Sequence, residues 1–287
     1  MKRHFMLTTL LSTGIALSFL LSLSPASRAE YGGCIKTWYT SDANKDYYGG
    51  LAWKGDYWSG YLWENHSETK HLLKLDPSVP DEGRAQILSR IEYTGSTSSH
   101  GDIGLAWDPT NNCWWLTDPW ADRSIYRMDA EGGGWLSSFS GISNAHDLHF
   151  DEENTLLYVS SNVKDYFRKY DVSDPNNPVL VGGNIPTGGD NTFAAPGIVV
   201  VGDKIWVTND INKVAARNIY ELNLDGTRTG RWITTQGSPS DAKAVMLTFD
   251  GQYLWVRSNV TEDDDQLRIY QMDIGLPPPT TPTPITT

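Results

Sequence analysis

Three ionisable side chains lie within four consecutive residues near the middle of the chain, in the segment His146-Asp147-Leu148-His149. Imidazoles beside a carboxylate can bind a transition metal, and they can also transfer protons near neutral pH. His100 and Asp102 form a second pair of the same kind earlier in the chain. His146, Asp147 and His149 therefore predict a divalent-metal site, with calcium or zinc bound, or an acid–base site. A hydrogen-bonded structural plug is the alternative.

These residues belong to a pattern of three strands that recurs five times along the chain. In each copy an apolar first strand ends in an aromatic residue or valine, and a second strand follows that is centred on Trp or Tyr. The first strands are LAW at 51–53, LAWD at 105–108, LHFD at 148–151, VVVG at 199–202 and LTFD at 247–250. A repeat of about fifty residues corresponds to one four-stranded blade of a β-propeller.

Two further columns of the repeat predict structural roles. The aromatic residues at the centre of the second strands are expected in the core between blades: Trp63, Trp115, Tyr158, Trp206 and Trp255. The third strands end in aspartates that recur in all blades but one, and we expect them to cap turns: Asp76, Asp129, Asp171 and Asp273.

The fifth copy lacks a fourth strand, because the chain turns into prolines at 277–279. The N-terminal segment Cys34–Tyr39 has the composition of a strand and belongs to no copy. We therefore predict an all-β, five-bladed β-propeller spanning residues 30–276, with this N-terminal strand closing the last blade. A β-sandwich is the alternative fold, but it would not explain five copies of one pattern.

The five blades serve as controls for one another, and blade three departs most from the repeat. The position just before the terminal aromatic residue is occupied by Ala52, Ala106, His149, Val200 and Thr248. The position two residues earlier is occupied by Gly50, Gly104, Asp147, Ile198 and Met246. Because first strands line the central channel of a propeller, we expect Asp147 and His149 around it, with His146 preceding them.

A second departure is Glu64, whose column in the other blades is Leu116, Val159, Val207 and Val256. A carboxylate buried there would need a cation or hydrogen bonds to hold its charge. The alternative is a one-residue register shift in blade one, which would turn the side chain outward.

Polar loops follow the second strands and supply the predicted ligand-binding residues, which are Asp118, Trp120, Asn162, Asn209 and Asn259. A ring of such oxygen atoms suits calcium, although Asn and Asp are also common turn formers. Trp120 could stack on a sugar ring or a peptide.

The ends of the chain predict export. Residues 1–29 combine a basic start, an apolar run and small residues before Ala29, as in a signal peptide; an uncleaved membrane anchor is the alternative. No later segment is apolar enough to span a membrane, and the composition of residues 277–287 indicates a Pro/Thr-rich tail or linker.

Without the three basic residues of the leader, the net charge of the chain is 20 − 35 = −15, which argues against nucleic-acid binding. We expect a secreted, periplasmic or surface-attached monomer.

Blade three resembles the LVIVD-type repeat of secreted bacterial and archaeal propellers, in YVSSN at 158–162 and YDVSDPNNPVLVG at 170–182. The other blades resemble YVTN- and NHL-type repeats more loosely, as in IWVTN at 205–209. These resemblances imply a propeller with a secreted or cell-surface habit, and they imply no single reaction.

Three functions fit the sequence. The leading hypothesis is a binding module for a glycan, a peptide or a cell-surface protein. The second is a metal-assisted lyase or hydrolase at the mouth of the channel, with Glu64, His100, Asp102, His146, Asp147 and His149 as its catalytic candidates. The third is a structural or assembly scaffold.

Overall fold

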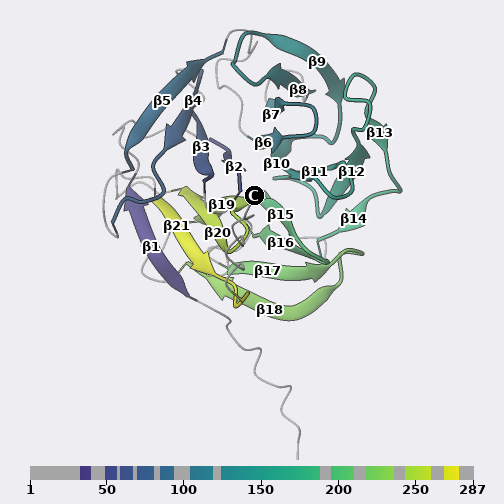
Figure 1. The fold of residues 1–287 in the computed structure, drawn as a ribbon. Coiled ribbons are helices and arrows are strands. Elements are labelled where there is room, and N and C mark those ends of the chain that lie inside the picture. Colours follow the sequence, from purple (N-terminus) through teal and green to yellow (C-terminus); the bar gives the residue numbers. More distant parts are fainter. Residues whose placement is uncertain are drawn as a thin grey trace, which may run out of the picture.

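The computed structural model describes residues 33–39, 49–56, 59–66, 70–80, 85–93, 104–118, 124–187, 195–209, 218–235, 243–259 and 268–277. In these ranges the regular structure is entirely β-strand, and five antiparallel sheets are arranged in a ring (Figure 1). This confirms the all-β, five-bladed propeller. No helix long and apolar enough to cross a membrane occurs in the described part of the chain. The predicted leader, and the predicted tail beyond Pro277, lie outside the described residues.

Each blade is a meander whose first strand lies at the centre of the ring (Figure 1). Blade one contains β2 (Leu51–Lys54), β3 (Tyr61–His66), β4 (His71–Leu75) and β5 (Ile87–Glu92). Blade two contains β6 (Leu105–Asp108), β7 (Cys113–Asp118), β8 (Ser124–Asp129) and β9 (Trp135–Ser140). Blade three contains β10 (Ala145–Asp151), β11 (Leu156–Ser161) and β12 (Tyr166–Asp171), with the short strands β13 (Val179–Leu180) and β14 (Ile185–Pro186) both paired to β12.

Blade four contains β15 (Ile198–Val201), β16 (Lys204–Thr208), β17 (Asn218–Asn223) and β18 (Arg228–Thr234). Blade five contains β19 (Lys243–Phe249), β20 (Tyr253–Asn259), β21 (Arg268–Asp273) and, as its outer strand, β1 (Cys34–Tyr39). Cys34 and Cys113 thus lie in non-adjacent blades, and no disulfide joins them.

The N-terminal strand closes the ring, as predicted. β1 pairs antiparallel with β21, from Cys34 opposite Met272 to Tyr39 opposite Arg268. The Trp38 side chain of β1 is fully buried, with its ring centroid 4.7 Å from that of Trp255. Its indole Nε1 donates a hydrogen bond to the Val79 carbonyl oxygen of blade one at 3.1 Å. β1 therefore joins the last blade to the first.

The core is divided into five main clusters, each between two neighbouring blades. The predicted aromatic column of the second strands is buried in these clusters, as expected. Between blades one and two, for example, the rings of Trp63 and Trp114 lie 5.2 Å apart. Burying a large apolar side chain stabilises a fold by about 1.5–3 kcal/mol, so these interfaces hold the ring together.

The turns between strands are closed by aspartates. The predicted caps at the ends of the third strands are confirmed, since Asp76, Asp129, Asp171 and Asp273 each accept a backbone N–H two residues further on. At the ends of two first strands, Asp108 and Asp250 accept the indole N–H groups of Trp115 and Trp255. These bonds explain why Asp so often follows the first strand in the repeat.

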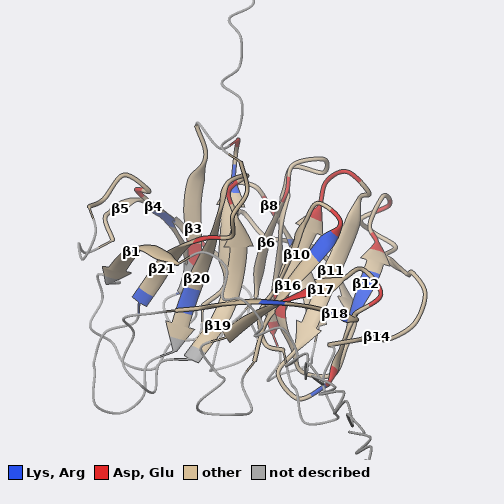
Figure 2. Cartoon of the chain, turned by 90° about the horizontal axis from the view of Figure 1, so that it is seen from below, with Lys and Arg blue, Asp and Glu red and all other residues tan. Residues whose placement is uncertain are grey.

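We call the side of the ring that carries these turns the hairpin face. It contains the turns between first and second strands and between third and fourth strands, and it forms the upper end of the molecule in Figure 2. Many of its residues are acidic: Asp56, Asp76, Asp108, Asp129, Glu131, Asp151, Glu152, Glu153, Asp171, Asp174, Asp203, Asp225, Asp250 and Asp273. Most of the loops on the opposite face fall outside the described residues.

Candidate functional site

Hydroxyl groups on the second strands link the first strands of neighbouring blades around the channel. In blade two, Thr117 Oγ1 accepts the Gly104 N–H at 2.7 Å and donates to the His146 carbonyl oxygen of blade three at 3.1 Å. The same arrangement recurs at Ser160, between Asp147 and Pro196, and at Thr208, between Gly197 and Val245. Three consecutive blade junctions are thus joined by one type of contact.

Blade five has Arg257 in place of the hydroxyl residue. Its Nη1 donates to the Gly49 carbonyl oxygen of blade one at 3.0 Å, and its Nε lies 2.7 Å from Glu64 Oε1. Both side chains are buried, and burial lowers the pKa of the guanidinium while Glu64 opposes this shift. Glu64 is paired opposite Leu51 in β2, so it keeps the register of the repeat. The register-shift alternative is therefore wrong, and Glu64 is the partner of a cation from the adjoining blade.

Asp147 is fully buried at the centre of the ring and contacts three blades. Its Oδ2 accepts the N–H groups of Ile198 in blade four and Leu247 in blade five, each at 3.1 Å. Burial raises the pKa of this carboxyl group well above its usual value, against the opposing effect of the backbone hydrogen bonds. Within the described residues its Oδ1 has no hydrogen-bond partner.

Strand pairing corrects the sequence alignment of blade four by one residue. Ile198 pairs with Val207, as Leu148 pairs with Val159, so the blade-four equivalents of Asp147 and His149 are Gly197 and Val199. The Asp147 column therefore contains glycine in blades one, two and four.

Two of the glycines of this column have a steric cause. A Cβ atom at Gly104 would lie 2.6 Å from the His146 carbonyl oxygen, and one at Gly197 would lie 2.5 Å from that of Val245. The two blades that carry a side chain here, at Asp147 and Met246, both have a register irregularity in the first strand. A β-bulge re-aims side chains, which gives Asp147 its place in the channel.

The two histidines beside Asp147 have separate environments. His146 is buried, and its Nδ1 lies 3.3 Å from the Pro196 carbonyl oxygen. His149 is half-buried, and burial lowers its pKa to about 4, so its ring is neutral at pH 7. Among the residues that the structure describes, no three His, Cys, Asp or Glu side chains converge as a metal site. His100 and Asp102 lie outside the described residues.

The predicted ring of polar loop residues is only partly described. Asp118 is the last residue of β7 and is buried, while Asn162 and Asn209 directly follow β11 and β16. Asn259 is the last residue of β20, but the structure does not describe its side chain. Trp120 lies outside the described residues. The calcium-site and stacking hypotheses for these residues remain predictions.

A cavity of about 510 Å³ lies at the hairpin face, and sequence reasoning missed it. It is lined by the ends of the first strands and by the following turns in blades one, two, three and five. Its aromatic lining comes from one column of the repeat, namely Trp53, Trp107, Phe150 and Phe249. Asp56, Glu152, Asp250 and His149 supply its ionisable groups, and the described lining includes no Lys or Arg. The recurring terminal aromatic residue was the signal available in the sequence.

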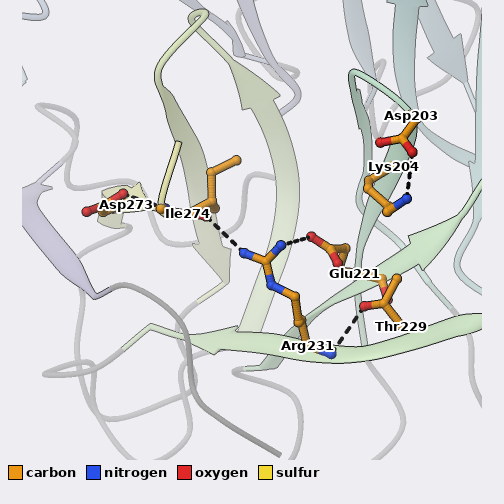
Figure 3. Close-up of polar contacts among 8 residues, drawn as sticks. Asp203, Lys204, Glu221, Thr229, Arg231, Asp273 and Ile274 are labelled. Atoms are coloured by element: carbon orange, nitrogen blue, oxygen red, sulfur yellow. Dashed lines mark hydrogen bonds and ion pairs between the residues drawn. The ribbon is translucent and has the colours of Figure 1, made fainter. Parts of the chain in front are cut away.

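Basic side chains beside this cavity and in blade four have interaction partners of their own. The Lys54 ammonium lies over Trp107, 3.6 Å from the ring centroid. In blade four, which does not line the cavity, Lys204 pairs with Asp203 at 2.7 Å and Arg231 with Glu221 at 2.8 Å (Figure 3). Arg231 also donates to the Ile274 carbonyl oxygen of blade five (Figure 3).

No protein-family description matches the chain, and no curated protein is similar to it in sequence. A crystal structure of a functionally unknown protein from Desulfotomaculum acetoxidans DSM 771 is similar, with a TM-score of 0.42 and 11% sequence identity. The match covers 70% of this chain and 59% of that one, so the chain spans about three fifths of its length.

Proposed function

We propose that this protein is a non-catalytic binding module whose ligand occupies the hairpin-face cavity. The cavity itself carries the proposal: its volume of about 510 Å³ and its aromatic lining with a few polar groups are typical of ligand sites. A glycan, a peptide or a segment of a partner protein could present a group of this size.

The second function, a metal-assisted lyase or hydrolase at the channel, has less support. Its described candidates already serve the fold: Glu64 pairs with Arg257, and Asp147 accepts two backbone N–H groups. Among the described candidates, His149 alone also lines the cavity. Catalytic groups need to converge on one reacting atom, and the four described candidates, which include His146 beside the Pro196 carbonyl oxygen, have different environments.

We further propose that the binding module is exported and acts as a monomer in the periplasm, outside the cell or at its surface. The predicted leader of residues 1–29, the Pro/Thr-rich composition of 277–287 and the strongly negative charge support this location. The resemblance of blade three to LVIVD-type repeats supports it as well. Detection of the mature chain in the cell-free or periplasmic fraction would test export.

The binding proposal is tested by a ligand screen combined with cavity-filling variants. Glycans, peptides and small organic molecules would be screened by ligand-observed NMR, and each hit titrated against Ala106→Leu and Ala52→Leu, which add bulk to the lining. The matched control is Ser138→Leu, which places the same side chain on the exposed outer strand of blade two.

We expect the hits to bind the control like the natural protein and to be lost in both filled variants. Melting temperatures are measured for all variants, because Ala52 and Ala106 are also buried in the core between blades, and a loss of binding counts only in a variant that remains folded. Hits that bind the filled variants unchanged, or a screen without hits, would contradict the proposal.

A further inference from the structure

The hairpin-face cavity places aromatic faces and carboxylates together with no basic side chain in its described lining. We propose that it binds an organic cation, that is, a protonated amine or a quaternary ammonium group on a small molecule or on a lysine side chain. This inference rests on the proposed function, because it names the class of ligand that the binding module takes.

The aromatic residues supply the first part of the argument. Trp53, Trp107, Phe150 and Phe249 line the cavity from four different blades, and each of them also packs against the core between two blades. The face of an aromatic ring carries negative charge density and attracts cations, and rings arranged around a ligand recognise quaternary ammonium groups.

The carboxylates supply the second part. Asp56 and Asp250 hold their own turns, through hydrogen bonds from Ser59 and from the backbone N–H groups of Gln252 and Tyr253. Glu152 is exposed in the turn after β10 and lines the cavity, so its carboxylate is placed to meet a ligand. The many other acidic turns of the hairpin face extend this negative potential beyond the cavity and favour the approach of cations.

The molecule already uses this chemistry at the wall of the cavity. Trp107 lines the cavity and also holds the Lys54 ammonium 3.6 Å from its ring centroid, with Trp114 at 5.0 Å and Trp63 at 5.8 Å. Lys54 is a like charge for an incoming cation. The described lining of the cavity contains the three carboxylates of Asp56, Glu152 and Asp250 and no Lys or Arg, so the charge of the lining favours a cationic ligand.

The test compares cations with neutral molecules of the same shape. Choline would be titrated into the mature protein by calorimetry beside dimethylbutanol, its neutral carbon isostere. The peptide Gly-Lys-Gly, acetylated at its N-terminus and amidated at its C-terminus, would be titrated beside the same capped peptide with norleucine in place of lysine, because a free N-terminal amine would itself be a cation. Binding of choline indicates a small-molecule source, and binding of the lysine peptide alone indicates a peptide source. Either cation should bind more tightly than its neutral partner, and added salt should weaken it.

A matched pair of variants tests whether the Glu152 carboxylate contributes to cation binding. Glu152→Gln removes the lining carboxylate and should weaken cation binding about two- to five-fold, as expected for a partly exposed ion pair. Glu153→Gln changes the next residue of the same turn, which is exposed but does not line the cavity, and should leave binding unchanged. Neither side chain is buried, so both variants should fold.

The outcomes separate this inference from the proposed function. If the neutral isosteres bind as tightly as the cations, or if Glu152→Gln and Glu153→Gln behave alike, the cation inference is wrong and the cavity remains a binding site. A third outcome is that no cation binds, while another ligand from the screen binds the natural protein and does not bind Ala106→Leu. In that case the cation inference is wrong and the proposed binding function stands. If nothing binds at all, both proposals are overturned.

Discussion

The Asp147 carboxyl group, which connects three blades at one point, predicts a specific pH dependence. In the folded protein its pKa is raised by burial, whereas in the unfolded chain it is about 3.9. Between these two values the folded state binds the proton more tightly, so the stability that Asp147 contributes is complete below about pH 4 and falls as the pH rises. Asp147→Asn keeps an oxygen acceptor for the Ile198 and Leu247 N–H groups but cannot ionise.

We therefore expect the stability of the natural protein relative to Asp147→Asn to decrease by up to about 1.4 kcal/mol per pH unit until the folded pKa is reached. Denaturant unfolding of both proteins from about pH 4 to about pH 8 measures this difference, and effects of all other titrating groups cancel. A difference that stays constant, or that grows with pH, would mean that the two N–H groups hold the carboxylate ionised in the folded state.

The polar departures in the sequence identified the unusual residues, but not what they contact. Asp147 and Glu64 stood out because their columns are otherwise glycine or apolar, and both are buried as the pattern indicates. Their partners are set by the neighbouring blades: Arg257 is about two hundred residues from Glu64 in sequence and beside it in space. Only the closed ring brings such pairs together, and a single sequence contains no measure of that proximity.

At the scale of elements, the contribution of the N-terminal strand β1 to the stability of the ring can be tested. Trp38 is fully buried between blades five and one, so Trp38→Ala should destabilise the protein by about 3–5 kcal/mol, as for other large-to-small core substitutions. Ile35→Ala is the matched control in the same strand, since Ile35 is 41% exposed and should change stability by less than about 0.5 kcal/mol. Guanidinium unfolding curves would measure both; equal stabilities for the two variants would show that β1 does not secure the ring.

The strands themselves were predictable, whereas their exact alignment was not. Every blade repeats an aromatic residue in its second strand, and every blade except blade four has a capping Asp at the end of its third strand, so these residues locate the strands from sequence alone. The one-residue error in blade four arose from its first turn, where Gly202 and Asp203 alone connect β15 to β16, while the corresponding turn of blade two has four residues, 109–112. The bulges in β10 and β19 leave no mark in composition. The cavity was missed because its lining comes from turns of four blades.

At the scale of the whole molecule, the buried pair of Glu64 and Arg257 joins the last blade to the first, and breaking it should cost more than removing it. Glu64→Leu leaves the Arg257 charge buried without its partner and should destabilise the ring by about 3–5 kcal/mol. The double variant Glu64→Leu/Arg257→Thr introduces the residues that blade two has at these positions, Leu116 and Thr117. It should recover most of the loss, because no unpaired charge remains.

Denaturant unfolding of the natural protein, the single variant and the double variant provides the measurement. A double variant no more stable than Glu64→Leu would show that the pair itself, and not merely the avoidance of a buried charge, is needed at this junction.

The pairing of β1 with β21 also determines when the ring can finish folding. Cys34 lies opposite Met272, so these partners are separated by 272 − 34 = 238 positions along the chain. Contacts of such long range form late, since the entropy of closing the loop must be overcome first. When the ribosome has synthesised blades one to four, β1 has been made but β21, the strand with which it pairs, has not. Until β21 emerges, both ends of the growing ring expose strand edges, and that interval is when a chaperone would be most needed.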